Sequence, residues 1–298
     1  MIHHQDREKK TKESEKRIIF TGDDFGIALP VNEAIVDAHR SGVLTTASLM
    51  VGGKFACDAI ERARECPSLK VGLHLVLVEG RSVLPPDKIP LLVDTNGEFL
   101  TNLTLAGFEF FLRRGIRTQI EAEIRAQFEA FSKTGFTLDH VNAHNHMHLH
   151  PTILSLLLKV GREFDLRAVR LPNEPPVRSW KASRKLLGPK LVSFAFLCPW
   201  IKLMKFRLRQ AQVCFNDFIF GMADSGSMTE DLVNRMVRNL PDGITEIYLH
   251  PATRRCAEID RTMPTYRHED EFRTLISKSL IKTLGDIRIQ RIAFSDLN

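Results

Sequence analysis

Strands and helices alternate along most of this chain, and that order restricts the available folds more than any other feature of the sequence. Alternation of this kind implies parallel strands joined by right-handed crossovers. About seven or eight such units close into a barrel more readily than they form an open sheet. We therefore predict an α/β fold, a TIM-like (β/α) barrel of about seven parallel strands. The expected strands are residues 17–26, 44–51, 69–78, 138–150 (a strand running into a loop), 167–172, 214–220, 245–251 and 287–294, and the expected helices are 30–41, 55–65, 116–134, 151–164, 229–240 and 269–283.

The length and composition allow one large domain or two small ones. The chain has 298 residues, of which 43% are apolar, so it can bury a sizeable core. Residues 1–16 are polar and charged, without the apolar core of a signal peptide or membrane span, and we expect a disordered lead-in there. The five cysteines lie far apart without a C-x-x-C pair, which argues against disulfides or a thiolate zinc site and suits a reducing, cytoplasmic environment.

Positive charge is concentrated in one segment. Residues 175–216 contain nine Lys or Arg residues and neither Asp nor Glu, whereas the whole chain has a net charge of +6. The rest of the chain is therefore net negative, which argues against a surface that binds nucleic acid. The sequence also has no G-x-G-x-x-G or Walker-type loop, so nucleotide-binding folds are disfavoured.

Histidines are concentrated in residues 138–151, where five of the eleven in the chain occur, all at even positions. A period of two places alternate side chains on one face of a strand, whereas a helix would spread them around its axis. We therefore expect several imidazoles to point the same way. Because imidazole binds borderline divalent metals and titrates near neutral pH, the pattern His144, His146 and His148 predicts a metal-binding or catalytic role.

Four expected strand ends carry groups that suit a single site, since sites in parallel α/β folds lie at the carboxyl ends of strands. These groups are Asp23 and Asp24, His74, the alternating histidines, and His250. Each has a simpler explanation: the two acids fit a turn, His74 a hydrogen-bonded core histidine, and His250 a capping or packing residue. A polar group in the middle of the apolar run 71–77 is costly to bury without a partner, however, and metal ligation would satisfy it.

These residue types suit hydrolysis assisted by a metal ion. One carboxylate and two imidazoles leave a metal ion with open positions for water and substrate, which is typical of catalytic sites. The second carboxylate of the Asp-Asp pair could take a proton from the water, and a histidine on the far side could protonate a leaving amine. The sequence thus predicts hydrolysis of an amide or ester.

Four stretches of the chain resemble the YdjC-like carbohydrate deacetylases, a family related in mechanism to polysaccharide deacetylases. The resemblance covers residues 17–298 and implies a single domain, a distorted (β/α) barrel, with a basic apolar insertion at about 175–213. It is closest to the hopanoid-biosynthesis-associated HpnK branch. The family stretches are Asp23-Asp24-Phe25-Gly26, Gly72-Leu73-His74-Leu75, residues 139–148 and Leu249-His250-Pro251, and those similar to the branch are 47–52, 74–81, 123–131, 168–172 and 293–297.

The resemblance implies a role for each group. Asp24, His74 and His144 match the family's metal ligands, Asp23 matches its general base, and His250 matches the histidine expected to act as acid. Three nitrogen and oxygen ligands favour Zn2+ as the metal, with Mg2+ as the alternative associated with the family. The residues expected to support the ligands or contact the substrate are His146, His148, Asp139, Arg170 and Glu174.

The resemblance also implies the substrate. Enzymes of the family remove the acetyl group from N-acetylglucosamine units, and the hopanoid branch is expected to act on a glycosylated hopanoid, leaving glucosamine and acetate. The chain departs from the family at Asn142, where related chains often carry Asp. A carboxylate close to the metal ligands is then missing, and Asp139 is the candidate to replace it.

The insertion gives separate support for a lipid-linked substrate. Residues 191–206 are apolar with basic flanks. The segment is too short to cross a bilayer, and Pro199 interrupts it. Its composition suits a helix lying on an anionic membrane surface, which would place the protein in the cytoplasm at the inner face of the membrane. A helical lid or a homodimer contact explains the same pattern equally well.

The predicted function is therefore metal-dependent N-deacetylation of a glycolipid that bears N-acetylglucosamine. The alternatives are a soluble chitooligosaccharide deacetylase and a non-catalytic, membrane-associated scaffold. The joint presence of Asp23, Asp24, His74, His144 and His250 argues against the scaffold.

Overall fold

A single parallel sheet forms the centre of the protein. The structure is a computed structural model that describes residues 16–101, 107, 110, 114–185 and 187–297. Six strands run in the order β4-β3-β2-β1-β6-β5, and β7 pairs with β1. All pairings are parallel, which confirms the predicted α/β class. The strands are β1 (Lys16–Phe25), β2 (Thr46–Leu49), β3 (Lys70–Leu75), β4 (Leu138–Ala143), β5 (Phe218–Phe220), β6 (Gly243–Leu249) and β7 (Gln290–Arg291).

The sheet curls into a distorted barrel because residues 167–173 connect its two edges. The amide of Val141 in β4 donates to the carbonyl of Ala168, at 2.9 Å. The amide of Ile219 in β5 donates to the carbonyl of Asn173, at 3.1 Å. This segment forms only isolated bridges, so the strand expected at 167–172 is not regular. Pro172 lacks an amide donor, which prevents a continuous ladder there.

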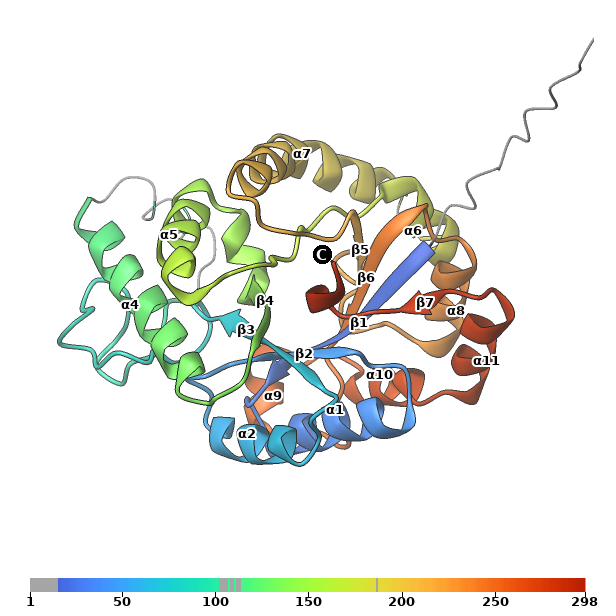
Figure 1. The fold of residues 1–298 in the computed structure, drawn as a ribbon, viewed down its shortest axis with the longest axis horizontal. Helices are drawn as coiled ribbons and strands as arrows, with labels where there is room; N and C mark the ends of the chain where they lie inside the picture. Colours follow the sequence, from blue (N-terminus) through green and yellow to red (C-terminus); the bar gives the residue numbers. More distant parts are fainter. Residues whose placement is uncertain (1–15, 102–106, 108–109, 111–113, 186, 298) are drawn as a thin grey trace, which may run out of the picture.

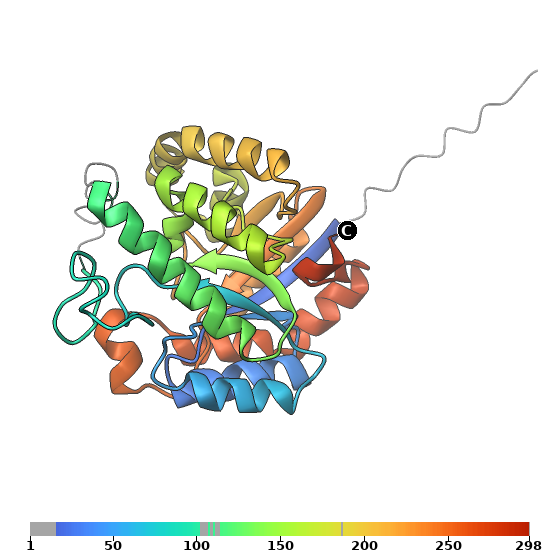
Figure 2. The ribbon, with the colours of Figure 1, turned by 60° about the vertical axis from the view of Figure 1, so that its left-hand side comes forward.

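Helices surround the strands, as Figure 1 shows. The helix expected at 116–134 is present as α4, and Ile116, Ile120, Ile124 and Phe128 form its buried stripe. Figure 2 brings α4 forward, where it lies alongside α5. The helices are α1 (Leu29–Ser41), α2 (Ala56–Arg64), α4 (Arg114–Ser132), α5 (Pro151–Gly161), α6 (Pro176–Ser183), α7 (Leu187–Gln210), α8 (Glu230–Arg238), α9 (Ala257–Thr262), α10 (His268–Leu275) and α11 (Lys278–Asp286), with short 3-10 turns η1 (His144–Leu149), η2 (Arg162–Phe164) and η3 (Phe294–Asp296).

The C-terminal part differs from the expectation in two places. The helix expected at 269–283 is two helices, because the Ser277 hydroxyl caps α11 by accepting the amides of Ser279 and Leu280, at 3.1 and 3.3 Å. The strand expected at 287–294 contains only the two residues of β7. The chain then enters η3, which lies at the centre of the ring of helices in Figure 1.

The basic insertion is helical. Residues 175–213 contain α6 and α7, and α7 buries Ile201, Met204 and Leu208 against the barrel. None of the helices in the described ranges combines the length and hydrophobicity that crossing a bilayer requires. The lead-in expected at residues 1–16 lies outside the described residues except for Lys16, with which β1 begins.

Candidate active site

Four strands direct polar side chains into one pocket at their carboxyl ends. Asp23 and Asp24 lie in β1, His74 lies in β3, and His144 and His250 follow directly after β4 and β6. The pocket has a volume of about 250 Å³ and is lined by Asp23, His74, His144 and His250, among others. The structure therefore brings together the residues that the sequence placed at separate strand ends.

An irregularity in β1 lets two consecutive carboxylates serve the same site. Successive side chains of a regular strand point to opposite faces. Here the pairing of β1 with β2 shifts register between Gly22 and Phe25, and Asp24 has a left-handed φ of 62°. Asp is one of the few residues that tolerate this conformation, which is enriched at functional sites. The turn is fixed by Asn32, whose side-chain oxygen accepts the amide of Gly26 at 2.7 Å.

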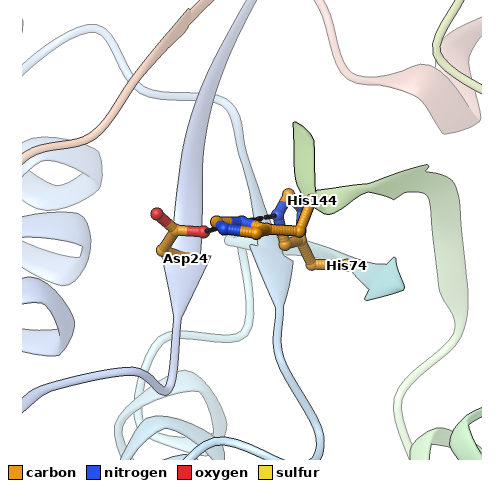
Figure 3. Close-up of side chains that lie close together, drawn as sticks. All are labelled: Asp24, His74 and His144. Carbon is orange, nitrogen blue, oxygen red and sulfur yellow. Dashed lines mark hydrogen bonds and ion pairs between the residues drawn. The ribbon is translucent and has the colours of Figure 1, made fainter. Parts of the chain in front are cut away.

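Asp24, His74 and His144 form a triangle of potential metal ligands (Figure 3). Asp24 Oδ1 lies 3.3 Å from His74 Nε2 and 3.2 Å from His144 Nδ1, and the two nitrogens are 3.4 Å apart. Both oxygens of Asp24 are buried, and within the described residues neither has a hydrogen-bond partner. Burial disfavours the ionised form, but His144 and His74 hold the pKa of Asp24 well below its usual value.

The spacing of this triangle tests whether the residues fit a metal ion. Ligands of a tetrahedral zinc ion with bonds of about 2.0–2.1 Å lie about 3.3–3.4 Å apart. Neighbouring ligands of an octahedral magnesium ion with similar bonds lie about 2.9 Å apart. The observed separations of 3.2–3.4 Å therefore fit a tetrahedral divalent cation, and the buried carboxylate of Asp24 supplies negative charge that such an ion needs.

Asn142 supports His74 in place of the carboxylate that the sequence comparison left missing. The Nδ1–H of His74 donates to Asn142 Oδ1 at 2.7 Å, which leaves the lone pair of Nε2 directed at the triangle. Asp139, the candidate for this role, does not bond to His74 itself: its carboxylate accepts hydrogen bonds from Thr46, His140 and Ser295.

Asp23 belongs to a buried charge network with Arg170 and Glu246. The guanidinium of Arg170 donates to both oxygens of Asp23, at 2.6 and 3.0 Å, and to Glu246 at 2.7–3.0 Å. The side chains of Arg170 and Glu246 are fully buried. Burial alone would raise the pKa of Asp23, but the adjacent Arg170 lowers it well below its usual value. Asp23 is therefore held as a fixed, ionised carboxylate beside the triangle.

His250 lies beside a second buried acid, Glu271. A carboxylate oxygen of Glu271 accepts the backbone amide of His250 at 2.6 Å and lies 3.9 Å from His250 Nδ1. Burial lowers the pKa of His250 to about 4 and raises the pKa of Glu271 to about 7. The imidazole of His250 is therefore neutral at neutral pH, and it lines the same pocket as Asp23.

The alternating histidines do not share one strand face. The strand β4 ends at Ala143, and η1 includes two left-handed residues, Asn145 and His146, each with φ of 53°. His144 therefore points toward Asp24 and His74, whereas His146 Nε2 lies 3.0 Å from the hydroxyl of Tyr248. His148 donates from Nε2 to the carbonyl of Arg170 at 2.9 Å. The shared strand face that the period of two predicted is therefore wrong beyond Ala143.

Glu174 acts on the pocket through the backbone. One of its oxygens accepts the amides of Met222 and Ala223, at 2.9 and 3.0 Å. The other oxygen accepts the hydroxyl of Ser179 at 2.5 Å. Because Met222 lines the pocket, Glu174 helps to fix the shape of the pocket wall.

Several pocket residues were not identified from the sequence. Tyr248 and Tyr266 are the two tyrosines of the chain, and both line the pocket. Glu246, Tyr248 and His250 occur at alternate positions of one strand and its end, so a period of two in residues 245–251 could have revealed them. Glu271 follows the pocket strands by some twenty residues and has no comparable signal.

The buried charge network gives a stability prediction. Arg170→Met should lower the free energy of unfolding by about 3–5 kcal/mol, because it leaves two carboxylates buried without their counter-charge. Urea denaturation of the metal-free protein would measure the change. The triple variant Arg170→Met, Asp23→Asn, Glu246→Gln removes all three charges and should recover most of the loss. An Arg170→Met variant as stable as the wild type would show that the network is not energetically coupled.

Comparison with known proteins gives the family. The chain matches a family described as YdjC-like protein over residues 17–286. A carbohydrate deacetylase of Brevibacillus brevis is 29% identical over 282 residues, which cover 94% of this chain and 99% of that protein. Another, of Oceanobacillus iheyensis, is 35% identical over 150 residues, which cover 50% of this chain and 63% of that protein.

A solved structure shares the fold. It is an Enterococcus faecalis protein provisionally described as a cellobiose-phosphate cleavage protein, with 23% identity and a TM-score of 0.74. The superposition covers 95% of this chain and 99% of that chain. With a family match that spans most of its length, this chain belongs to the YdjC-like family.

Proposed function

We propose that this protein is a metal-dependent carbohydrate deacetylase that hydrolyses the acetamide of N-acetylglucosamine units. The observation that carries the proposal is the triangle of Asp24, His74 and His144, whose carboxylate is buried without a hydrogen-bond partner among the described residues. The ionised Asp23 lies beside it in the same pocket. The relatives named carbohydrate deacetylase, one of which is similar over 94% of this chain, supply the reaction class.

The proposed mechanism assigns one task to each side chain. A divalent cation held by Asp24, His74 and His144 would act as a Lewis acid and lower the pKa of water in its open positions. Asp23, held in place by Arg170, takes the proton of the attacking water, whose oxygen bonds to the acetyl carbon. The carbon–nitrogen bond then breaks. His250, which is neutral at rest, takes up the proton that Asp23 removed from the water and passes it to the leaving nitrogen, so the products are the free amino sugar and acetate.

The ligand set favours zinc as the metal. One carboxylate and two imidazoles match the three-ligand catalytic zinc sites. The donor separations of 3.2–3.4 Å fit tetrahedral geometry better than the octahedral geometry of magnesium, which is the alternative.

Acetate release tests the function directly. The purified full chain, loaded with zinc, should release acetate from N-acetylglucosamine oligosaccharides. Treatment with a chelator should abolish the release, and added zinc should restore it. Full turnover by a metal-free preparation in chelator would overturn the metal-dependent mechanism, and absence of acetate from every N-acetylated saccharide would overturn the reaction class.

We further propose that the acetylated sugar is carried by a lipid, such as a glycosylated hopanoid, and that α7 contacts the membrane. The outer side of α7 is apolar: Val192 is 71% exposed and Phe196 is 73% exposed. Lys202 and Arg209 are exposed on the same helix. An exposed apolar surface with flanking positive charge is typical of helices that lie on anionic membranes. A soluble chitooligosaccharide substrate is the alternative.

Liposome binding separates these alternatives. Lys202→Gln/Arg209→Gln should weaken binding to anionic vesicles at low salt by about 30-fold, since each charge near the surface contributes about 1 kcal/mol. The activity on a vesicle-borne substrate should fall, while the activity on a small soluble substrate is retained. Lys205 and Arg207 are unsuitable for substitution, because Lys205 lies over the ring of Phe215 and Arg207 donates to Ser155 in α5.

The matched control is Lys278→Gln/Lys282→Gln, which removes two exposed charges from α11 on a different part of the barrel. It should leave vesicle binding unchanged. Equal loss of both activities in the α7 variant would assign the helix to a lid or a dimer contact. A wild-type protein that ignores vesicles and prefers soluble oligosaccharides would establish the alternative substrate.

A further inference from the structure

A chain of hydrogen bonds runs through the protein interior and ends at the proposed metal ligand. It begins at Asp139, whose Oδ2 accepts from His140 Nδ1 at 2.9 Å. His140 Nε2 lies 3.0 Å from the hydroxyl of Ser48, and Ser48 Oγ accepts from Asn142 Nδ2 at 2.8 Å. Asn142 Oδ1 then accepts from Nδ1 of His74 at 2.7 Å. The residues of this chain are at most 3% exposed, so water does not compete for these bonds.

The donors and acceptors of this chain have a single consistent direction. The carboxylate of Asp139 only accepts, so His140 donates from Nδ1 and, in the tautomer that carries its proton there, accepts at Nε2. The hydroxyl of Ser48 therefore donates to His140, and its oxygen lone pair accepts from the Asn142 amide. This orientation turns Asn142 Oδ1 toward His74 and leaves the second N–H of the amide for Asp23, at 3.1 Å.

The opposite orientation of the Asn142 amide would disable the site. Its Nδ2 would then face His74 Nδ1, which would have to accept, and the ring proton of His74 would move to Nε2. That nitrogen belongs to the ligand triangle, where a proton excludes a metal ion. The Asn142 oxygen would also face the carboxylate of Asp23. The hydrogen bond from Asn142 to Ser48 opposes this rotation.

The surroundings of His140 hold the far end of the chain in place. A Cβ at position 72 in β3 would lie 2.4 Å from His140 Nδ1, so any residue other than Gly72 would displace the His140 ring. Phe294 stacks on the imidazole, with ring centroids 4.4 Å apart. The backbone amide of Ser295 donates to Asp139 Oδ1 at 2.9 Å. The turn η3 therefore closes the base of the barrel directly against Asp139 and His140.

We infer that Asp139, His140 and Ser48 are positioning residues that set the orientation of the Asn142 amide and, through it, the tautomer of His74 that binds the metal ion. The inference rests on the proposed function, since it requires His74 to be a ligand. Among the described residues, the hydrogen bonds of these three side chains reach the ligand triangle through Asn142, so we expect their effect to pass through its amide.

Zinc affinity of the full chain, measured by competition with a chromophoric chelator, tests this inference. Asn142→Ala should weaken zinc binding by about 10–100-fold, the usual cost of losing the partner of a metal-ligating histidine. Ser48→Ala should weaken it by about tenfold. In the Asn142→Ala background, Ser48→Ala should have no further effect, because its route to His74 is already broken. Asp139→Asn, which preserves the shape of the side chain, should also weaken zinc binding and serves as a second variant if Ser48→Ala does not fold.

The control is Ser277→Ala, which removes the cap of α11 and destabilises the protein away from the site. It should lower the Tm of the metal-free protein and leave zinc affinity unchanged. Two results would overturn the positioning role of the hydrogen-bond chain while the metal site stands. One is wild-type zinc affinity in both Ser48→Ala and Asp139→Asn, and the other is fully additive losses of zinc affinity in the Ser48→Ala/Asn142→Ala double variant. If the wild type binds no zinc, or if His74→Ala binds zinc with wild-type affinity, the metal site and the positioning role of the hydrogen-bond chain are both overturned.

Discussion

His74→Ala and His144→Ala are each expected to lose both the bound zinc and all measurable deacetylase activity. Each change removes one corner of a triangle whose edges are 3.2–3.4 Å, and two remaining protein ligands do not hold a catalytic zinc ion. The loss should match that of Asp24→Asn and exceed that of substitutions outside the triangle, because the proposed metal ion would supply both the Lewis acid and the activated water. Metal analysis of the purified variants, together with acetate release, measures the two effects.

The control for these variants is His39→Ala. His39 is a half-buried histidine that contacts Leu44 and Ser68, remote from the pocket. This variant should retain zinc and activity, which separates loss of a ligand from loss of a histidine in general. Zinc content equal to that of the wild type in His74→Ala would show that the triangle does not bind the metal.

Asp23→Asn is expected to retain zinc and lose about 10²–10⁴-fold in kcat, the usual scale for removing a general base. The oxygens of Asp23 accept hydrogen bonds from Arg170 and Asn142, at 2.6–3.1 Å, so we expect Asp23 to lie beside the proposed metal ion without ligating it. The amide has the same shape and cannot accept the proton. Metal analysis and steady-state kinetics on the same preparation give both quantities.

The neighbouring carboxylate provides the matched comparison. Asp24→Asn should lose the metal, because Asp24 is the acidic corner of the triangle. If Asp23→Asn loses zinc and Asp24→Asn retains it, the roles of the two acids are exchanged. If both variants retain zinc and activity, neither acid takes part in the reaction.

The order of the elements and the identity of the strand-end residues could be predicted from the sequence. Local signals carry this information: apolar runs for β1 and β3, and a helical stripe from Ile116 to Phe128 for α4. Parallel strands then bring their carboxyl ends together, so Asp23, His74 and His250 could be assigned to one pocket. The elements that failed were those with weak local signals, such as the two-residue β7 and the break at Ser277.

The arrangement within the site was decided only by the tertiary structure. The strand rule places Asp23 and Asp24 on opposite faces, and a register shift with a left-handed Asp24 overrides it. The support of His74 by Asn142 depends on the alignment of β3 and β4, and the pairing of Asp23 with Arg170 joins residues that are 147 positions apart.

The physical reason is the range of the forces involved. Side-chain period, capping and hydrophobicity act over a few neighbouring residues, so a sequence displays them directly. The direction of a buried hydrogen bond depends on which distant group completes it, because a buried polar atom must find a partner. The sequence by itself determined that Asp23, Asp24, His74, His144 and His250 belong to strand ends, and the fold determined which atom of each faces the next.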